Sequence, residues 1–177
     1  MDGFLTDVLL LVALTLVNGL FAMSEIALVS SRKVRLQNLS DKGSAGARKA
    51  LELVRFPSRF LSTIQVGITS IGILSGAIGE KVLSAPLAKW IAEVPFFQPY
   101  AHGIALTLTV MALTYFTVVI GELVPKSLAL LAPERWASLM ARPLSWVAFV
   151  SRPLVLLLAR SSEWLLEAFG VKKDNEP

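Results

Sequence analysis

The sequence predicts an all-α membrane protein, with three transmembrane helices and short amphipathic helices at one membrane face. Hydrophobic residues make up 54% of its 177 residues and charged residues only 17%, although a soluble domain is usually about one quarter charged. The charges are also unevenly spread, since stretches 8–24, 60–79 and 94–121 contain none. An apolar helix of about 20 residues crosses the hydrocarbon layer of a bilayer. The lipid bilayer is therefore the expected partner of this chain.

Three spans follow from these stretches, at about 4–29, 60–80 and 101–123. The first span includes an acidic residue near each end, Asp7 and Glu25. It does not have the form of a cleaved signal peptide, because no basic residue precedes its apolar centre. We therefore expect it to remain as a membrane helix.

The basic residues indicate how the spans are oriented. Segment 32–59 contains eight of the 17 Lys and Arg residues, and the stretch after the third span contains seven more. Both lie on the same side of a three-span topology, and basic segments are retained in the cytoplasm. We therefore expect a multi-pass protein of the plasma membrane (the inner membrane of a bacterial cell), with the N-terminus outside and the C-terminus in the cytoplasm. The net charge of +4 follows from this topology and gives no reason to expect a nucleic-acid partner.

Two further regions are predicted to lie along the cytoplasmic face. Residues 47–56 place apolar residues at helical spacing among charged ones, which is typical of a short amphipathic helix. After the third span, Pro133, Pro143 and Pro153 recur every ten residues and should divide region 134–169 into short helices.

A fourth crossing at 139–160 is the alternative for this last region. It would place Arg152 near the centre of the bilayer, at a cost of about 3 kcal/mol. It would also move the C-terminus to the outside. We favour helices that lie along the inner leaflet, where arginine side chains reach the headgroups.

Polar residues inside the spans are the candidates for function, because each one is costly to bury in hydrocarbon. Glu122 is the most informative of them. It follows Gly121 and lies three residues before Pro125, whose missing N–H frees a backbone carbonyl near residue 121. A carboxylate beside free carbonyls and hydroxyl or amide side chains is an oxygen-only ligand set. Such a set suits hard cations such as Mg²⁺ or Na⁺.

The same residues also allow a purely structural interpretation. Glu122 can simply pair with Lys126 at the inner interface, and Glu25 can be a solvated or capping charge. Ser and Thr hydroxyls in membrane helices usually bond to their own backbone or to a neighbouring helix. Sequence spacing alone leaves both interpretations open.

The composition gives little support for an enzyme. Cysteine is absent and His102 is the single histidine, which excludes thiolate chemistry and His-rich metal sites. Ser127 directly follows Lys126, and no Gly-x-Ser-x-Gly turn occurs. We therefore expect no catalytic residues.

Three segments carry a resemblance to a known family: the run Gly121-Glu122-Leu123-Val124-Pro125-Lys126, the run from Asn18 to Leu28, and the run from Gln65 to Thr69. Together they resemble the transmembrane domain of the CorC/cyclin M (CNNM) family, over nearly the whole chain. The resemblance implies a homodimeric domain over residues 1–170, followed at 171–177 by the start of a linker to cytoplasmic CBS domains. The family is associated with Mg²⁺ export driven by Na⁺ entry, and this is the function we expect.

The resemblance also implies an ion site. The family's metal ligands correspond to polar or small positions on all three spans, namely Asn18, Ser24, Thr63, Gln65, Gly67, Gly121 and Glu122. Pro125, Lys126 and Glu25 would break the helix and support the site. Ala22 and Ile68 stand where many relatives carry side chains with an oxygen ligand, so the ligand set of this chain departs from theirs.

Two other functions would use the same ligands. One is Mg²⁺ uptake, and the other is a regulatory or scaffold role in which Mg²⁺ is sensed but not moved. Assembly also has two interpretations. Gly72, Gly76 and Gly79 form a stripe of small residues, which can serve a homodimer or packing within one chain.

Overall fold

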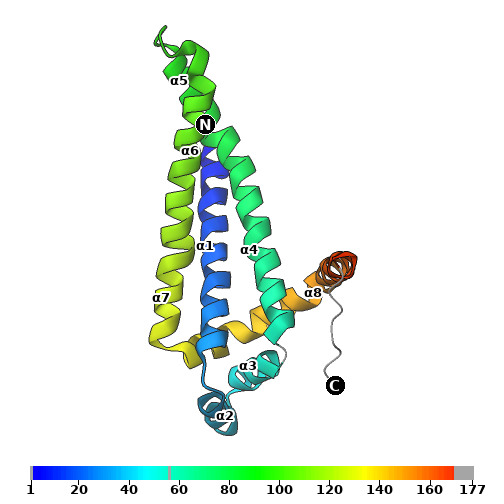
Figure 1. The fold of residues 1–177 in the computed structure, drawn as a ribbon. Helices are drawn as coiled ribbons and strands as arrows, with labels where there is room; N and C mark the ends of the chain where they lie inside the picture. Colours follow the sequence, from blue (N-terminus) through cyan, green and yellow to red (C-terminus); the bar gives the residue numbers. More distant parts are fainter. Residues whose placement is uncertain (1, 56, 170–177) are drawn as a thin grey trace.

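The computed structural model describes residues 2–55 and 57–169, and every regular element among them is helical. Three helical segments are long and apolar enough to cross a membrane, namely Gly3–Ser30, Phe60–Ala92 and Gln98–Leu131. They stand side by side, with α1 (Asp2–Ser30) between the other two (Figure 1). Large apolar side chains along them are exposed, for example Leu16 and Val110. These features confirm the predicted fold class, an all-α membrane protein with three spans.

The second span is longer than the predicted 60–80, because its helix continues past the first charged residues. α4 (Pro57–Gly79) leads through a π-helical turn, η1 (Glu80–Ser84), into α5 (Ala85–Ala92). Lys81 in this turn forms an ion pair with Asp7 of α1, with 3.2 Å between Nζ and Oδ2. The charges at the end of the apolar stretch therefore connect two helices and do not end one.

The third span also extends beyond its predicted end at 123. After the short 3₁₀ helix η2 (Gln98–Tyr100), α6 (Ala101–Val118) leads through the π turn η3 (Val119–Leu123) into α7 (Val124–Leu131). The helix does not end at Pro125, so the break expected there takes the form of a π turn just before the proline. This turn is the part of the fold that positions the candidate site.

Three amphipathic helices lie across one end of the bundle (Figure 1). α2 (Lys33–Asp41) has no counterpart among the predicted elements, whereas α3 (Ala45–Arg55) agrees closely with the helix predicted at 47–56, of which residue 56 lies outside the described residues. The turn between them contains Gly43 with a φ of +92°, a left-handed conformation that glycine adopts at little cost.

α8 (Pro133–Ala168) is one bent helix, so of the three prolines predicted to divide this region into short helices, Pro143 does not do so. Pro133 begins it, Pro143 lies within it, and a bend of 68° separates Pro133–Val150 from Arg152–Ala168, just before Pro153. Residues around Pro143 are buried against the neighbouring helices, which holds that half in place, whereas the half after the bend is exposed. A proline inside a helix removes one hydrogen bond and crowds the preceding turn, so the unsupported part bends.

The bend in α8 also tests the alternative of a fourth membrane crossing at 139–160. The two halves of α8 together satisfy the length and composition of a further span, but only as a broken one. Figure 1 shows α8 running across the end of the three spans and not beside them. A straight helix over 139–160 is therefore not formed.

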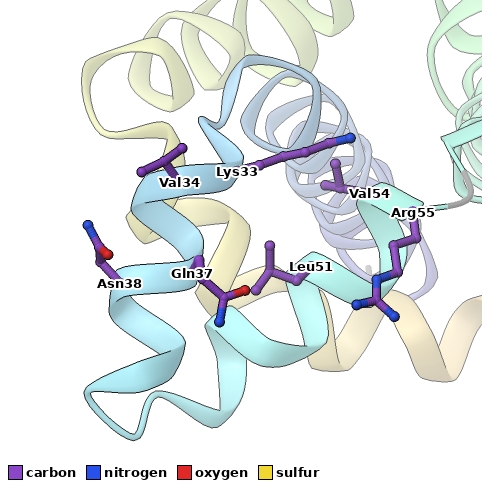
Figure 2. Close-up of a pocket in the computed structure, with 7 residues that line it drawn as sticks. All are labelled: Lys33, Val34, Gln37, Asn38, Leu51, Val54 and Arg55. Atoms are coloured by element: carbon purple, nitrogen blue, oxygen red, sulfur yellow. The ribbon is translucent and has the colours of Figure 1, made fainter.

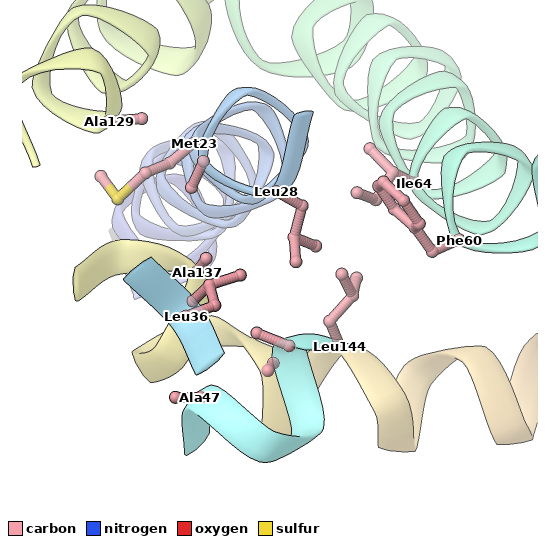
Figure 3. Close-up of a cluster of buried hydrophobic side chains, with 12 residues drawn as sticks. Met23, Leu28, Leu36, Ala47, Phe60, Ile64, Ala129, Ala137 and Leu144 are labelled. Atoms are coloured by element: carbon pink, nitrogen blue, oxygen red, sulfur yellow. The ribbon is translucent and has the colours of Figure 1, made fainter. Parts of the chain in front are cut away.

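The hydrophobic core lies where these helices meet the ends of the spans (Figure 3). Leu28, Leu36 and Ile64 are fully buried there, and alanines on α3, α7 and α8 let the helices approach closely. A close approach of this kind is at Gly46, where a methyl group would overlap the backbone carbonyl oxygen of Ser138. α3 and α8 are therefore held in direct backbone contact.

Glu134 fixes the end of α1 to the start of α8. Its side chain accepts a hydrogen bond from the backbone N–H of Arg32 (3.2 Å) and lies 3.8 Å from the guanidinium of Arg35. Glu134 is only 9% exposed, and it lies in the first turn of α8, where the helix dipole favours a negative charge. This carboxylate therefore sets the path of the chain between the first span and α2.

Candidate cation site on the third span

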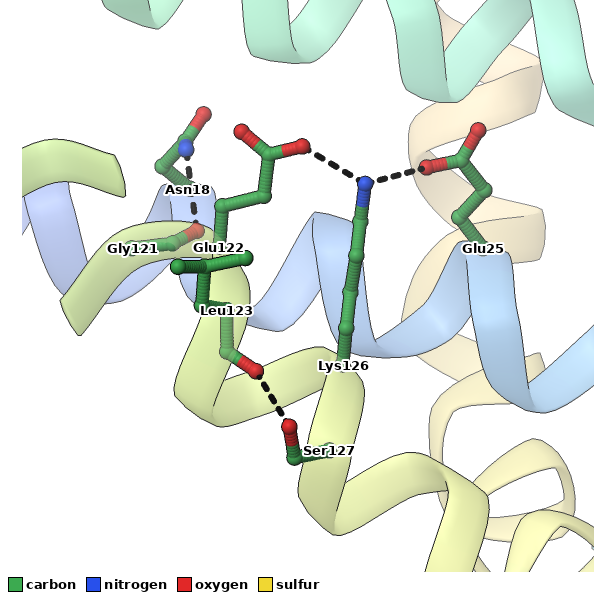
Figure 4. A network of polar contacts seen from close by, with 7 residues as sticks. All are labelled: Asn18, Glu25, Gly121, Glu122, Leu123, Lys126 and Ser127. Atoms are coloured by element: carbon green, nitrogen blue, oxygen red, sulfur yellow. Dashed lines mark hydrogen bonds and ion pairs between the residues drawn. The ribbon is translucent and has the colours of Figure 1, made fainter. Parts of the chain in front are cut away.

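The π turn η3 directs a backbone carbonyl toward α1. Pro125 has no N–H, so the carbonyl of Gly121, four residues earlier, lacks its usual α-helical partner. In the structure this oxygen accepts a hydrogen bond from the side-chain amide of Asn18, at 3.0 Å (Figure 4). The absence of a side chain at Gly121 allows this approach, because a Cβ there would lie 3.2 Å from the carbonyl oxygen of Thr15.

Asn18 has a second polar atom at the same place. The residue is 4% exposed, and its Oδ1 is buried without a hydrogen-bond donor among the described residues. A buried oxygen without a partner costs about 1–3 kcal/mol. An amide oxygen in this position is a suitable ligand for a hard cation, so the residues present fit such an ion.

Three charged side chains adjoin this pair. The ammonium of Lys126 lies 2.7 Å from Oε1 of Glu122 and 3.7 Å from Oε2 of Glu25 (Figure 4). The two carboxylates come from different spans and converge on one cation, and the side chains are only partly exposed, at 42% for Glu122 and 26% for Glu25. The place therefore attracts and holds a positive charge.

The ion pair between Glu122 and Lys126 is the contact that the purely structural interpretation of Glu122 requires. It does not conflict with the ligand role, because Lys126 and a bound cation would be alternative partners of the same carboxylates. Among the described residues, no group of three or more His, Cys, Asp or Glu side chains is placed to hold a metal ion. The arrangement is thus two carboxylates, one amide oxygen and one lysine.

The remaining predicted ligands are Ser24 on α1 and three positions on α4. Ser24 is buried, and its hydroxyl donates to the carbonyl oxygen of Leu20 in its own helix, at 2.6 Å. Thr63 is buried, Gln65 is exposed, and Gly67 is in contact with the ring of Phe21.

The α4 residues are separated from η3 because α1 stands between the two helices (Figure 1). The structure thus brings Asn18, Gly121, Glu122, Lys126 and Glu25 together within one chain, and it leaves the α4 positions on the other side of α1. The pairing of Glu122 with Lys126 is readable from their spacing of four residues, whereas the approach of Glu25 and Asn18 was implied only by the family resemblance.

A separate groove of about 430 Å³ lies between α2 and α3 (Figure 2). Lys33, Gln37 and Leu51 are among its lining residues, and Arg55 lies at one end. None of the predicted ion ligands lines it. The cation cluster and this groove are therefore distinct features of the fold.

Comparison with known proteins gives the family. Residues 9–177 match the cyclin M transmembrane N-terminal domain (CNNM). The UPF0053 protein sll0260 of Synechocystis is 44% identical over 158 residues, which cover 89% of this chain and 35% of that protein. The polyamine export protein of Salmonella typhimurium is 28% identical over 97% of this chain and 39% of its own length, and that of Haemophilus influenzae is 32% identical over 84% of this chain and 34% of its own.

The chain spans between one third and two fifths of the length of these relatives. The match to the family nevertheless covers nearly all of its residues, including the three spans and the π turn. Together with the helical membrane fold, this match shows that the chain belongs to the cyclin M (CNNM) transmembrane domain family.

Proposed function

We propose that this chain is the membrane domain of a cation exporter and that Mg²⁺ is its cargo. The observation that carries the proposal is the oxygen-rich cluster at η3, where Asn18 Oδ1 has no donor among the described residues and two carboxylates converge on one cation. Hard cations prefer such oxygen ligands. The family resemblance supports Mg²⁺ in particular, with inward movement of Na⁺ as the driving force.

The charges of the cluster suit an ion that must be released. Glu25 and Glu122 supply two negative charges and Lys126 supplies one positive charge, so an arriving cation meets a net charge of −1. Mg²⁺ gives up its water reluctantly, and a modest charge would hold it without trapping it. Movement of Lys126 away from the carboxylates would accompany binding, and a change in the packing of α1 against the third span would open the site to the other face.

A polyamine is the second candidate cargo. The end group of a polyamine is a primary ammonium, the same group that Lys126 places between Glu122 and Glu25 at 2.7 and 3.7 Å. Relatives from Salmonella typhimurium and Haemophilus influenzae carry the name polyamine export protein. A terminal ammonium could take the place of Lys126 with little change in the geometry of the carboxylates.

Flux through liposomes distinguishes these functions. The chain is reconstituted, and movement of Mg²⁺ and of radiolabelled spermidine is measured with and without a Na⁺ gradient. We expect Mg²⁺ flux that is stimulated by opposing Na⁺, lost in Glu122→Gln and kept in Glu167→Gln, which changes an exposed carboxylate on α8. Spermidine flux without Mg²⁺ flux would mean that a polyamine is the cargo. Saturable Mg²⁺ binding without flux would indicate a sensor.

We also propose that two copies of the chain associate. A methyl group added at Gly72 or Gly76 would meet no atom within 4 Å, whereas one at Gly79 would overlap Leu113 of α6. Gly79 thus packs within the chain, and the other two glycines leave an open surface that supports a homodimer. We further propose that the N-terminus lies outside, and that CBS domains follow in the cytoplasm after 171–177, which lie outside the described residues.

A further inference from the structure

A second cavity lies on the other side of α3 from the groove of Figure 2. It has a volume of about 550 Å³ and lies between α3, the start of α4 and the bend of α8. Its polar lining includes Lys49, Arg55 and Arg152. Because α8 turns by 68° just before Pro153, its two halves diverge here and leave space beside α3 and α4.

Most of the charged residues around this cavity are positive. Lys49 forms an ion pair with Glu52, which also lines the cavity. Arg55 and Arg152 have no acidic partner within 4.0 Å among the residues that the structure describes. A neighbouring depression shares Lys49 and adds Arg142, so the positive surface extends along α8. Such a surface is complementary to a negatively charged group.

The rest of the lining is mostly apolar and partly exposed. Phe149 and Leu156 are 73% and 50% exposed, and Phe60 contributes from α4. Phe60 is also the first residue of the second span. The cavity therefore lies at the height where a membrane helix passes from the headgroups into the hydrocarbon, with its basic and apolar residues side by side.

We propose that this cavity binds one anionic phospholipid, with the phosphate between Arg55 and Arg152 and an acyl chain along Phe149 and Leu156. Guanidinium groups bind phosphate through paired hydrogen bonds, and basic pockets beside membrane helices are known to hold lipid headgroups. The volume lies within the range of about 300–1,000 Å³ that is usual for small-ligand sites. A soluble phosphate compound would satisfy the arginines but make no contact with the apolar residues of the lining, which is why the lipid is favoured.

Native mass spectrometry of the chain in mild detergent tests the proposal. Phosphatidylglycerol and phosphatidylcholine with identical acyl chains are titrated separately, and the bound lipid is counted. We expect one phosphatidylglycerol to be retained at least tenfold more tightly than phosphatidylcholine. Arg55→Gln and Arg152→Gln should each weaken its binding about fivefold, the usual effect of one basic residue near an anionic membrane surface.

The matched control is Arg48→Gln, which removes the same charge from the same helix at an exposed residue that does not line the cavity. It should leave phosphatidylglycerol binding unchanged. An equal loss in Arg48→Gln, or equal retention of phosphatidylcholine, would overturn the proposal in favour of general attraction to a basic surface. The two cavity arginines are tested independently, and the melting temperature of each variant checks its folding.

A second arm separates a lipid from a soluble phosphate. Glycerol 3-phosphate carries the same phosphate without acyl chains and should not displace phosphatidylglycerol at millimolar concentration. Phe149→Ala should weaken lipid binding, whereas Phe97→Ala, which changes an exposed phenylalanine near the other end of the spans, should not. Displacement by glycerol 3-phosphate, or no effect of Phe149→Ala, would refute the lipid as the ligand.

Discussion

Replacing Lys126 by methionine should raise the affinity of the chain for Mg²⁺. The ammonium of Lys126 contacts Glu122 and Glu25, the two carboxylates that we assign to the cation. Methionine has a similar length, favours a helix and cannot pair with a carboxylate. The substitution therefore removes a competitor for the site without removing any proposed ligand.

The size of the effect follows from the two ion pairs. Their side chains are between 26% and 42% exposed, and pairs with this much access to solvent are worth about 0.2–1 kcal/mol each. Freeing both carboxylates should therefore favour Mg²⁺ binding by about 0.5–2 kcal/mol, which corresponds to an affinity about 2–30 times higher. Glu122→Gln removes a charge that offsets the dehydration of Mg²⁺, and it should lower the affinity by well over tenfold.

The assay is the rise in melting temperature with Mg²⁺ concentration, since a ligand that binds only the folded state stabilises it more at a given concentration when its affinity is higher. The rise should begin at a lower Mg²⁺ concentration in Lys126→Met and at a much higher one in Glu122→Gln. Lys89→Met, at an exposed lysine of α5, is the control and should behave as the wild type. Equal loss of the Mg²⁺ response in Lys126→Met and Glu122→Gln would refute the reasoning, because it would mean that the ion pair serves structure alone.

Three further changes test the fold and its orientation. Gly46→Ala should lower the stability of the folded chain by about 1–3 kcal/mol, because its methyl group meets the backbone of α8, whereas Gly103→Ala has open space and should not lower the melting temperature; equal melting temperatures would contradict the close contact. Glu134→Gln should cost about 1.5–3 kcal/mol, the usual value of a hydrogen bond to a charged group, and a melting curve that matches the wild type would exclude its role in joining α1 to α8. In intact cells, a cysteine at Gln98 should react with an impermeant thiol reagent and one at Ser44 should not, since basic segments remain inside; the reverse labelling would invert the proposed topology.

The spans were predictable because crossing a bilayer is a property of one continuous segment. About 20 apolar residues are needed whatever the rest of the chain does, and all three predicted spans are found as long helices. Their ends were not predictable in the same way. Charged residues end the apolar stretches, but Lys81 and Lys126 beside those ends each pair with a carboxylate, and the helices continue past them.

The prolines show where local rules stop being sufficient. Pro143 and Pro153 impose the same local constraint on a helix, yet α8 bends only near Pro153. The difference lies in their surroundings, because the half of α8 that contains Pro143 is packed against other helices and the half after the bend is exposed. Only the tertiary structure distinguishes the two positions.

The sequence by itself determined the membrane class, the three spans and the released carbonyl before Pro125, and it offered the pairing of Glu122 with Lys126 as one of two interpretations. Each of these depends on residues within one helical turn or one apolar segment, so spacing is enough to predict it. Only the tertiary structure decided that Asn18 and Glu25 join this turn, and that the α4 positions lie on the far side of α1. The physical reason is that contacts between helices depend on which of their faces pack together. In a membrane the lipid is as apolar as the side chains, so these faces are selected by small residues and by polar pairs that are distant in the chain.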